Sequence, residues 1–156
     1  MIGIITVSDT RSVDTDASGP AILGALEALG YTEFEARLVP DELEPIRQAI
    51  LELSGMCEAV FTTGGTGFTS RDVTPEATAP ILERQAPNLV ELMRLKGLER
   101  TPMSHLTRGL AGTRGKCLIV NLPGSPKGAR EGIEALAPLL PHIFEQITDR
   151  GGGHPC

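Results

Sequence analysis

Three threonines and three glycines lie together directly after an apolar run, in the segment Thr62-Thr63-Gly64-Gly65-Thr66-Gly67. Glycine has no Cβ atom to keep a ligand away from the backbone, and it adopts positive φ angles readily. Successive N–H groups of such a loop can point inward and bind an anion, and threonine hydroxyls add further donors. We therefore expect a phosphate site from Thr63 to Gly67. The alternative is a tight turn without a ligand. The segment matches neither GxGxxG nor GxxxxGK[ST], so the mechanisms of those loops do not transfer.

Two aspartates are candidates for a metal site beside this loop. Asp72 precedes an expected helix and could hold Mg²⁺, which would neutralise phosphate oxygens and a leaving pyrophosphate. Asp41 follows an expected strand. The alternatives are a helix cap for Asp72 and an ordinary turn residue for Asp41. Two carboxylates from different loops that converge on one metal-nucleotide would suit nucleotidyl transfer.

A further segment, Asn121-Leu122-Pro123-Gly124-Ser125-Pro126, opens the last long helix. Ser125 would lie at the N-terminus of that helix, where free N–H groups bind anions. The alternative is an ordinary Pro-Gly turn followed by a helix cap.

Hydrophobic periodicity predicts the elements that must position these residues. The expected strands are Ile2–Val7, Phe34–Val39, Cys57–Thr63 and Cys117–Asn121. The expected helices are Gly19–Leu29, Glu42–Leu53, one with Thr74 as N-cap and Pro75 as its first residue, Pro87–Leu98, and Lys127–Leu136 with a restart before Ile147. Residues 101–115 are expected to be irregular.

Strands that alternate with helices predict an α/β fold with a mostly parallel sheet, in one domain over residues 1–150 with a short tail at 151–156. Ligands of such sheets bind beyond the C-terminal ends of the strands. Four unusual segments each follow an expected strand, and we expect them to gather on one rim: Ser8-Asp9, Pro40-Asp41, Gly64 to Asp72, and Asn121 to Pro126.

Composition argues against several other classes of protein. The net charge of −6 argues against nonspecific nucleic-acid binding, which needs a basic face. The three cysteines form no CxxC pair, and the three histidines show no metal-ligand spacing. No Ser-His-Asp or Cys-His arrangement is visible, and no apolar run is long enough to cross a bilayer. We expect a cytoplasmic protein that binds neither nucleic acid nor membrane.

Taken together, these segments resemble the molybdopterin adenylyltransferase family, which includes bacterial enzymes and the G domains of gephyrin-like proteins. The matching pieces appear in the family's order and span nearly the whole chain: Thr6 to Asp9, Val39 to Glu42, Thr62 to Glu76, Arg108 with Ala111-Gly112, and Asn121 to Pro126. The run TTGGTGFTSRDVTPEA makes the match specific. Many relatives have Leu-Ser-Arg where this chain has Leu106-Thr107-Arg108.

The resemblance implies a three-layer α/β/α sandwich and Mg²⁺-dependent adenylylation of molybdopterin by ATP, with release of pyrophosphate. It implies catalytic and metal-binding roles for Asp41 and Asp72, and a nucleotide-phosphate site at Ser8 and from Thr63 to Gly67. It also implies a molybdopterin or anion site at Arg108, Gly124 and Ser125. The expected assembly is a homotrimer or a dimer of trimers, with the molybdate-inserting enzyme as a candidate partner. Two rival hypotheses stay open, a molybdopterin-binding scaffold without turnover and a related nucleotide hydrolase.

Overall fold

One six-stranded sheet runs through the protein in the order β2-β1-β3-β6-β5-β4. The computed structural model describes residues 1–12 and 14–150, so the predicted tail at 151–156 lies outside the described residues. Strands β1, β2, β3 and β6 are mutually parallel, whereas β5 and β4 are antiparallel to their neighbours. The prediction of a mostly parallel sheet is therefore confirmed. The strands are β1 (Ile2–Val7), β2 (Phe34–Val39), β3 (Ala59–Thr63), β4 (Arg84–Gln85), β5 (Ala111–Arg114) and β6 (Cys117–Leu122).

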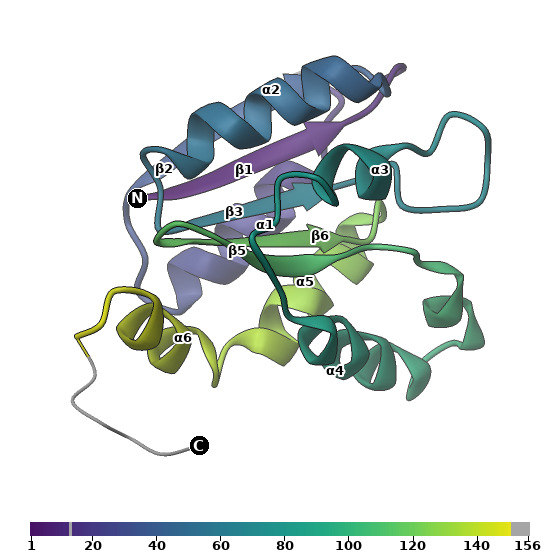
Figure 1. The fold of residues 1–156 in the computed structure, drawn as a ribbon. Helices are drawn as coiled ribbons and strands as arrows, with labels where there is room; N and C mark the ends of the chain where they lie inside the picture. Colours follow the sequence, from purple (N-terminus) through teal and green to yellow (C-terminus); the bar gives the residue numbers. More distant parts are fainter. Residues whose placement is uncertain (13, 151–156) are drawn as a thin grey trace.

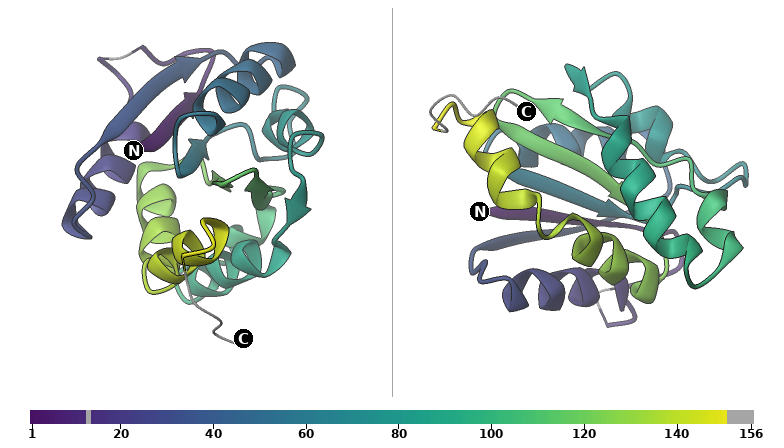
Figure 2. Two further views of the ribbon diagram at one scale, coloured as in Figure 1. Left: turned by 60° about the vertical axis from the view of Figure 1, so that its left-hand side comes forward. Right: turned by 90° about the horizontal axis from the view of Figure 1, so that it is seen from below.

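Helices cover both faces of the sheet, which gives the three layers expected from the resemblance (Figures 1 and 2). Their bounds are α1 (Ser18–Ala28), α2 (Leu43–Ser54), α3 (Thr74–Thr78), α4 (Pro87–Leu98), α5 (Pro126–Leu136) and α6 (Leu140–Ile147), with a 3₁₀ turn, η1, at Pro102–Leu106. Helices α2 and α3 pack on one face, and α1, α4, α5 and α6 on the other. Among the described residues, no helix combines the length and the apolar character needed to cross a membrane.

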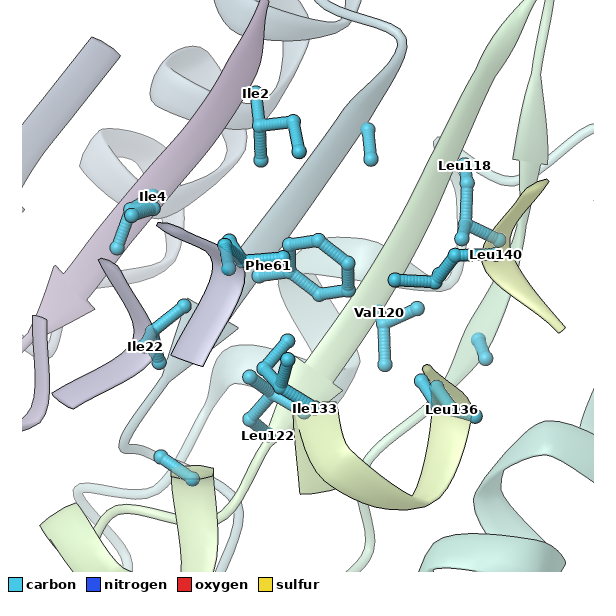
Figure 3. Close-up of a cluster of buried hydrophobic side chains, with 14 residues drawn as sticks. Ile2, Ile4, Ile22, Phe61, Leu118, Val120, Leu122, Ile133, Leu136 and Leu140 are labelled. Atoms are coloured by element: carbon cyan, nitrogen blue, oxygen red, sulfur yellow. The ribbon is translucent and has the colours of Figure 1, made fainter. Parts of the chain in front are cut away.

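The core follows from strands that are apolar on both sides, as parallel sheets require when helices cover both faces. In β1, Ile2 and Ile4 face the α1 and α5 layer, whereas Ile5 and Val7 face α2. Phe61 of β3 lies at the centre of the hydrophobic cluster on the α1 and α5 face of the sheet, between the strands and α5 (Figure 3). All six residues of β1 and all six of β6 are buried, so these central strands form a firm base for the loops that follow them.

Several predicted boundaries were wrong. Strand β3 begins at Ala59 rather than Cys57, because the Cys57 N–H is hydrogen-bonded to Leu53 O and still closes the end of α2 (2.8 Å). The stretch 101–115 is not wholly irregular, since it contains η1 and β5. Strand β5 has only four residues and forms a hairpin with β6, so its pairing depends on the neighbouring strand rather than on its own apolar pattern.

The start of α3 also differs from the prediction. Val73 is the N-cap, and Thr74 is the first helical residue. The Thr74 hydroxyl does not cap the helix but donates to Gly64 O (2.9 Å), and the Thr74 N–H donates to Gly65 O (3.0 Å). A tertiary contact with the glycine loop has therefore replaced the local cap, and α3 is anchored directly to that loop.

Replacement of Gly24 by Ala should stabilise the protein. Gly24 is an exposed residue within α1, and a Cβ atom added there would meet no other atom within 4 Å. Alanine restricts the unfolded chain and favours the helix by about 0.8–1.0 kcal/mol relative to glycine. Urea denaturation should show a gain of that size in the free energy of unfolding. A loss of stability would mean that α1 is not a regular helix at this position.

Candidate functional site

The carboxyl ends of the four parallel strands meet on one rim, as predicted. The Ser8 N–H donates to Val39 O (2.9 Å), which joins the ends of β1 and β2. The Thr63 hydroxyl donates to Pro123 O (2.6 Å), which joins the ends of β3 and β6. Figure 1 shows the arrowheads of β1, β3 and β6 on the same side, where the loop after β3 extends. The four segments selected from the sequence are therefore neighbours in space.

Two glycines of this loop lie where there is no room for a side chain. Gly64 and Gly65 both have positive φ angles, +96° and +69°. A Cβ atom on Gly64 would lie 2.3 Å from Val7 O, and one on Gly65 would lie 2.3 Å from Thr74 Oγ1. The Gly65 Cβ position is also 3.3 Å from Asp41 Oδ1. The loop therefore packs closely on β1 and α3, with its backbone beside a carboxylate.

The threonines and the serine of the predicted phosphate site have different surroundings. Thr63 and Thr66 are buried, and the only hydroxyl proton of Thr63 is used in its bond to Pro123. Thr63 therefore supports the loop through its side chain. Ser8 Oγ accepts the N–H groups of Thr10 (3.3 Å) and Arg11 (3.1 Å), so its own proton can be donated toward the rim.

Asp41 is coupled to Asp9, a rim residue for which the sequence pattern indicates no role. The Asp9 N–H donates to Asp41 Oδ2 (3.0 Å), and the Asp41 N–H donates to Asp9 Oδ1 (2.8 Å). Burial raises the pKa of Asp41, and the nearby charges of Asp9 and Asp72 raise it further. A bound cation would offset the repulsion among these carboxylates.

Asp72 is held at the other side of the glycine loop. Its Oδ2 atom accepts hydrogen bonds from the Thr69 N–H (2.9 Å) and the Thr69 hydroxyl (2.8 Å). The same oxygen lies 2.8 Å from the position that a Cβ atom on Gly67 would occupy. Asp72 is thus fixed against the backbone of the loop, and its charge acts on the pKa of Asp41.

Arg108 holds the glycine loop and the segment after it through its three guanidinium nitrogens. Its Nε donates to Gly67 O (2.7 Å), its Nη2 to Asp72 O (2.9 Å), and its Nη1 pairs with Glu76 (2.6 Å). Its backbone N–H donates to Thr66 O (2.9 Å). These acceptors lie 32 to 42 positions earlier in the chain, so no local pattern could have predicted them. The anion-binding role predicted for Arg108 remains a prediction.

A buried amide supports the rim under the same loop. Asn121 donates through Nδ2 to the hydroxyls of Thr62 (3.0 Å) and Thr78 (3.1 Å). Its Oδ1 accepts the Leu110 N–H (3.0 Å). A polar residue within the apolar strand CLIVNL was the available signal for this role. Asn121 links β6 to β3 and α3, and so fixes the relative positions of the loops that follow β3 and β6.

Ser125 and Gly124 lie between the rim and a neighbouring cavity. Ser125 is the N-cap of α5 and accepts the Gly128 N–H (3.0 Å). Gly124 packs on Gly64, because a Cβ atom on Gly124 would lie 3.3 Å from Gly64 Cα. The cavity beside Ser125 encloses about 170 Å³. Its lining is mostly apolar and includes Val90, Met93, Met103, Thr107 and Pro123.

The rim fits Mg²⁺ only as a site that a substrate completes. Within residues 1–12 and 14–150, no group of three or more His, Cys, Asp or Glu side chains could hold a metal ion. Asp41 Oδ1 accepts no hydrogen bond from these residues, and its carboxylate is repelled by Asp9 and Asp72. Mg²⁺ commonly binds through one or two carboxylates together with substrate phosphates and water. Asp41 and Asp72 match that donor set.

The fold and this rim define a known class of protein. Residues 3–142 match the family described as "Probable molybdopterin binding domain", and the chain belongs to that family.

Individual relatives agree with this assignment. The molybdopterin adenylyltransferase of Helicobacter pylori strain J99 is 40% identical over 152 residues, which cover 94% of this chain and 86% of the relative. The molybdopterin biosynthesis enzyme MoaB from Thermus thermophilus superposes with a TM-score of 0.83 at 46% identity, over 95% of this chain and 96% of its own. The molybdenum cofactor synthesis protein cinnamon of Drosophila melanogaster is 40% identical over 94% of this chain, which spans only 25% of that protein's length.

Proposed function

We propose that this chain transfers the adenylyl group of ATP to molybdopterin in the presence of Mg²⁺ and releases pyrophosphate. The observation that carries the proposal is the rim, where a glycine loop in close backbone contact with β1 lies between the carboxylates of Asp41 and Asp72. The H. pylori relative, which this chain covers over 86% of its length, is named for the same activity.

The triphosphate of ATP is assigned to the glycine loop. Gly64 and Gly65 present backbone without side chains, and Ser8 has a hydroxyl proton to donate at the same rim. Asp41 and Asp72 would hold Mg²⁺, which when bound neutralises charge on the phosphate oxygens and on the leaving pyrophosphate. Arg108 keeps the loop and the Asp72 backbone in place through its bonds to Gly67 O and Asp72 O.

The pterin is assigned to the cavity beside Ser125. A flat heterocycle suits a cavity whose exposed wall is mostly apolar but which also offers polar groups, among them Thr107, Ser125, Asn121, Arg94 and Glu131. Because Gly124 packs on Gly64, a ligand in this cavity can extend its terminal phosphate toward the glycine loop. The two substrates would then meet above the ends of β3 and β6.

The reaction needs positioning and charge neutralisation more than it needs a reactive side chain. An oxygen of the terminal phosphate of molybdopterin forms a bond to the α-phosphorus of ATP. The bond from that phosphorus to the pyrophosphate oxygen breaks, and pyrophosphate leaves with the electron pair. The cysteines of the described chain do not suit nucleophilic attack, because burial raises the pKa of Cys57 and raises that of Cys117 to about 12.

The finer details of the assembly are also proposals. We infer from the resemblance that the protein works in the cytoplasm as a homotrimer or a dimer of trimers, and passes its product to a molybdate-inserting enzyme. Light scattering of the purified protein, compared with the 16.5 kDa mass of one chain, tests the assembly.

The test of the proposed function is pyrophosphate release from Mg-ATP, measured with and without molybdopterin. Adenylyl transfer predicts release that requires molybdopterin. Release without molybdopterin would instead support the nucleotide hydrolase. Tight molybdopterin binding with no release would support the scaffold.

A further inference from the structure

Asp9 contacts both of the loops that carry the proposed metal-binding carboxylates. Through Oδ1 it accepts the Asp41 N–H (2.8 Å), and through Oδ2 it accepts Arg71 Nε (2.9 Å) and Arg71 Nη2. Arg71 is the immediate neighbour of Asp72 in the loop after β3. One carboxylate at the end of β1 therefore links the loop after β2 to the loop after β3.

The same residue also orients the Asp41 side chain. The Asp9 N–H donates to Asp41 Oδ2 (3.0 Å). With Oδ2 held in this way, Asp41 Oδ1 lies over the glycine loop, 3.3 Å from the Cβ position of Gly65. Asp9 is hydrogen-bonded to Oδ2 only, so Oδ1, the oxygen that faces the glycine loop, accepts no hydrogen bond from Asp9.

The contact between Asp9 and Asp41 brings two negative charges together, which needs a compensating cation. Arg71 supplies that charge through its ion pair with Asp9 Oδ2. The ion pair is exposed, with 59% of the Arg71 side chain and 33% of the Asp9 side chain accessible. Exposed ion pairs contribute little to folding stability, so the main effect of this pair should be on the position of Asp9.

We propose that Asp9 is a positioning residue that sets the separation and orientation of the Asp41 and Asp72 carboxylates, and that Arg71 holds Asp9 in place for this task. The inference rests on the proposed function, because it assigns a purpose to the spacing of the two carboxylates. In this role Asp9 acts through its hydrogen bonds to Asp41 and Arg71.

The test compares Asp9→Ala, Asp9→Asn and Arg71→Met with the unaltered protein. One readout is the Mg²⁺ concentration that gives half-maximal pyrophosphate release. The other, which needs no turnover, is the binding of Mn²⁺ with α,β-methylene-ATP, followed by electron paramagnetic resonance. Asp9→Ala should raise both the Mg²⁺ requirement and the Mn²⁺ dissociation constant by about 10- to 100-fold, the usual cost of losing a partner that orients a metal ligand.

The other variants separate positioning from simple damage to the fold. Asn keeps an oxygen that can accept the Asp41 N–H, so Asp9→Asn should recover part of the loss seen with alanine. Asp9→Asn and Arg71→Met remove the same ion pair. The double variant should therefore have a Mn²⁺ dissociation constant no higher than that of whichever single variant binds Mn²⁺ less tightly. Glu44→Gln, which removes one partner of the exposed Glu44–Arg47 pair on α2, should behave like the unaltered protein.

Two results would overturn the inference. If Asp9→Ala binds Mn²⁺ with α,β-methylene-ATP as tightly as Glu44→Gln does, Asp9 does not position the carboxylates. If the unaltered protein itself does not bind this metal-nucleotide, the proposed function fails and the role of Asp9 fails with it. If the unaltered protein binds this metal-nucleotide but releases no pyrophosphate from Mg-ATP in the presence of molybdopterin, and Asp9→Ala weakens the binding, adenylyl transfer fails while the positioning role stands.

Discussion

Replacement of Asp72 by Asn should lower the turnover number for molybdopterin-dependent pyrophosphate release by about 10²–10³-fold, the scale on which loss of one charge-stabilising group affects a transition state. Asn has the same shape and keeps an oxygen to accept the Thr69 N–H and hydroxyl, so the loop should retain its geometry. Only the negative charge is lost, and a neutral amide is a much weaker ligand for Mg²⁺ than a carboxylate. The effect should therefore fall on the metal and on catalysis rather than on folding.

Steady-state kinetics at saturating Mg²⁺ and a thermal unfolding curve together check this expectation. Glu134→Gln is a matched control, because it removes a carboxylate from an exposed pair on α5, opposite Arg130. Both variants should unfold at the temperature of the unaltered protein, and only Asp72→Asn should lose turnover. Turnover of Asp72→Asn within threefold of the control would remove Asp72 from the proposed metal site.

Replacement of Gly64 by Ala should lower the free energy of unfolding by about 3 kcal/mol, the combined scale of a left-handed backbone and a steric overlap. The first cost arises because φ is +96° at this position. The second arises because the new Cβ atom would lie 2.3 Å from Val7 O, a backbone atom of a strand paired on both sides. Neither the loop nor β1 can move without breaking the sheet or the rim.

Gly115→Ala separates these two costs. Gly115 also has a positive φ angle, +55°, but a Cβ atom there would meet nothing within 4 Å. Urea denaturation should therefore show only the backbone cost of about 1–2 kcal/mol for Gly115→Ala. Equal losses in the two variants would show that the glycine loop does not pack against β1 as described.

Much of the fold could be predicted because the apolar pattern of each long strand or helix lies within that element's own sequence. The apolar runs of β1 and β6, the alternating pattern of β2, and the spacing of Ile46, Ile50 and Leu53 in α2 indicated their elements directly. Strands β4 and β5 were missed because two and four residues are too few to show a period. Their pairing comes from the hairpin and from the edge of the sheet.

The candidate site divides in a similar way. Residues that follow strands, such as Asp41 and Gly64, could be found because parallel topology brings such positions together. The contacts of Asp9 with Arg71 and of Arg108 with Gly67 join residues 62 and 41 positions apart. Their geometry depends on how the loops pack, and no spacing in the sequence encodes it.

In the proposed reaction, the α-phosphate of ATP moves with its adenosine to molybdopterin at this rim. The most direct measurement follows that phosphorus, with ATP labelled at the α-position, Mg²⁺ and molybdopterin, and separation of the products. Adenylyl transfer predicts label in adenylylated molybdopterin, with one pyrophosphate released for each adenylyl group transferred. Label recovered as free AMP, or label that stays in ATP while molybdopterin remains bound, would contradict it.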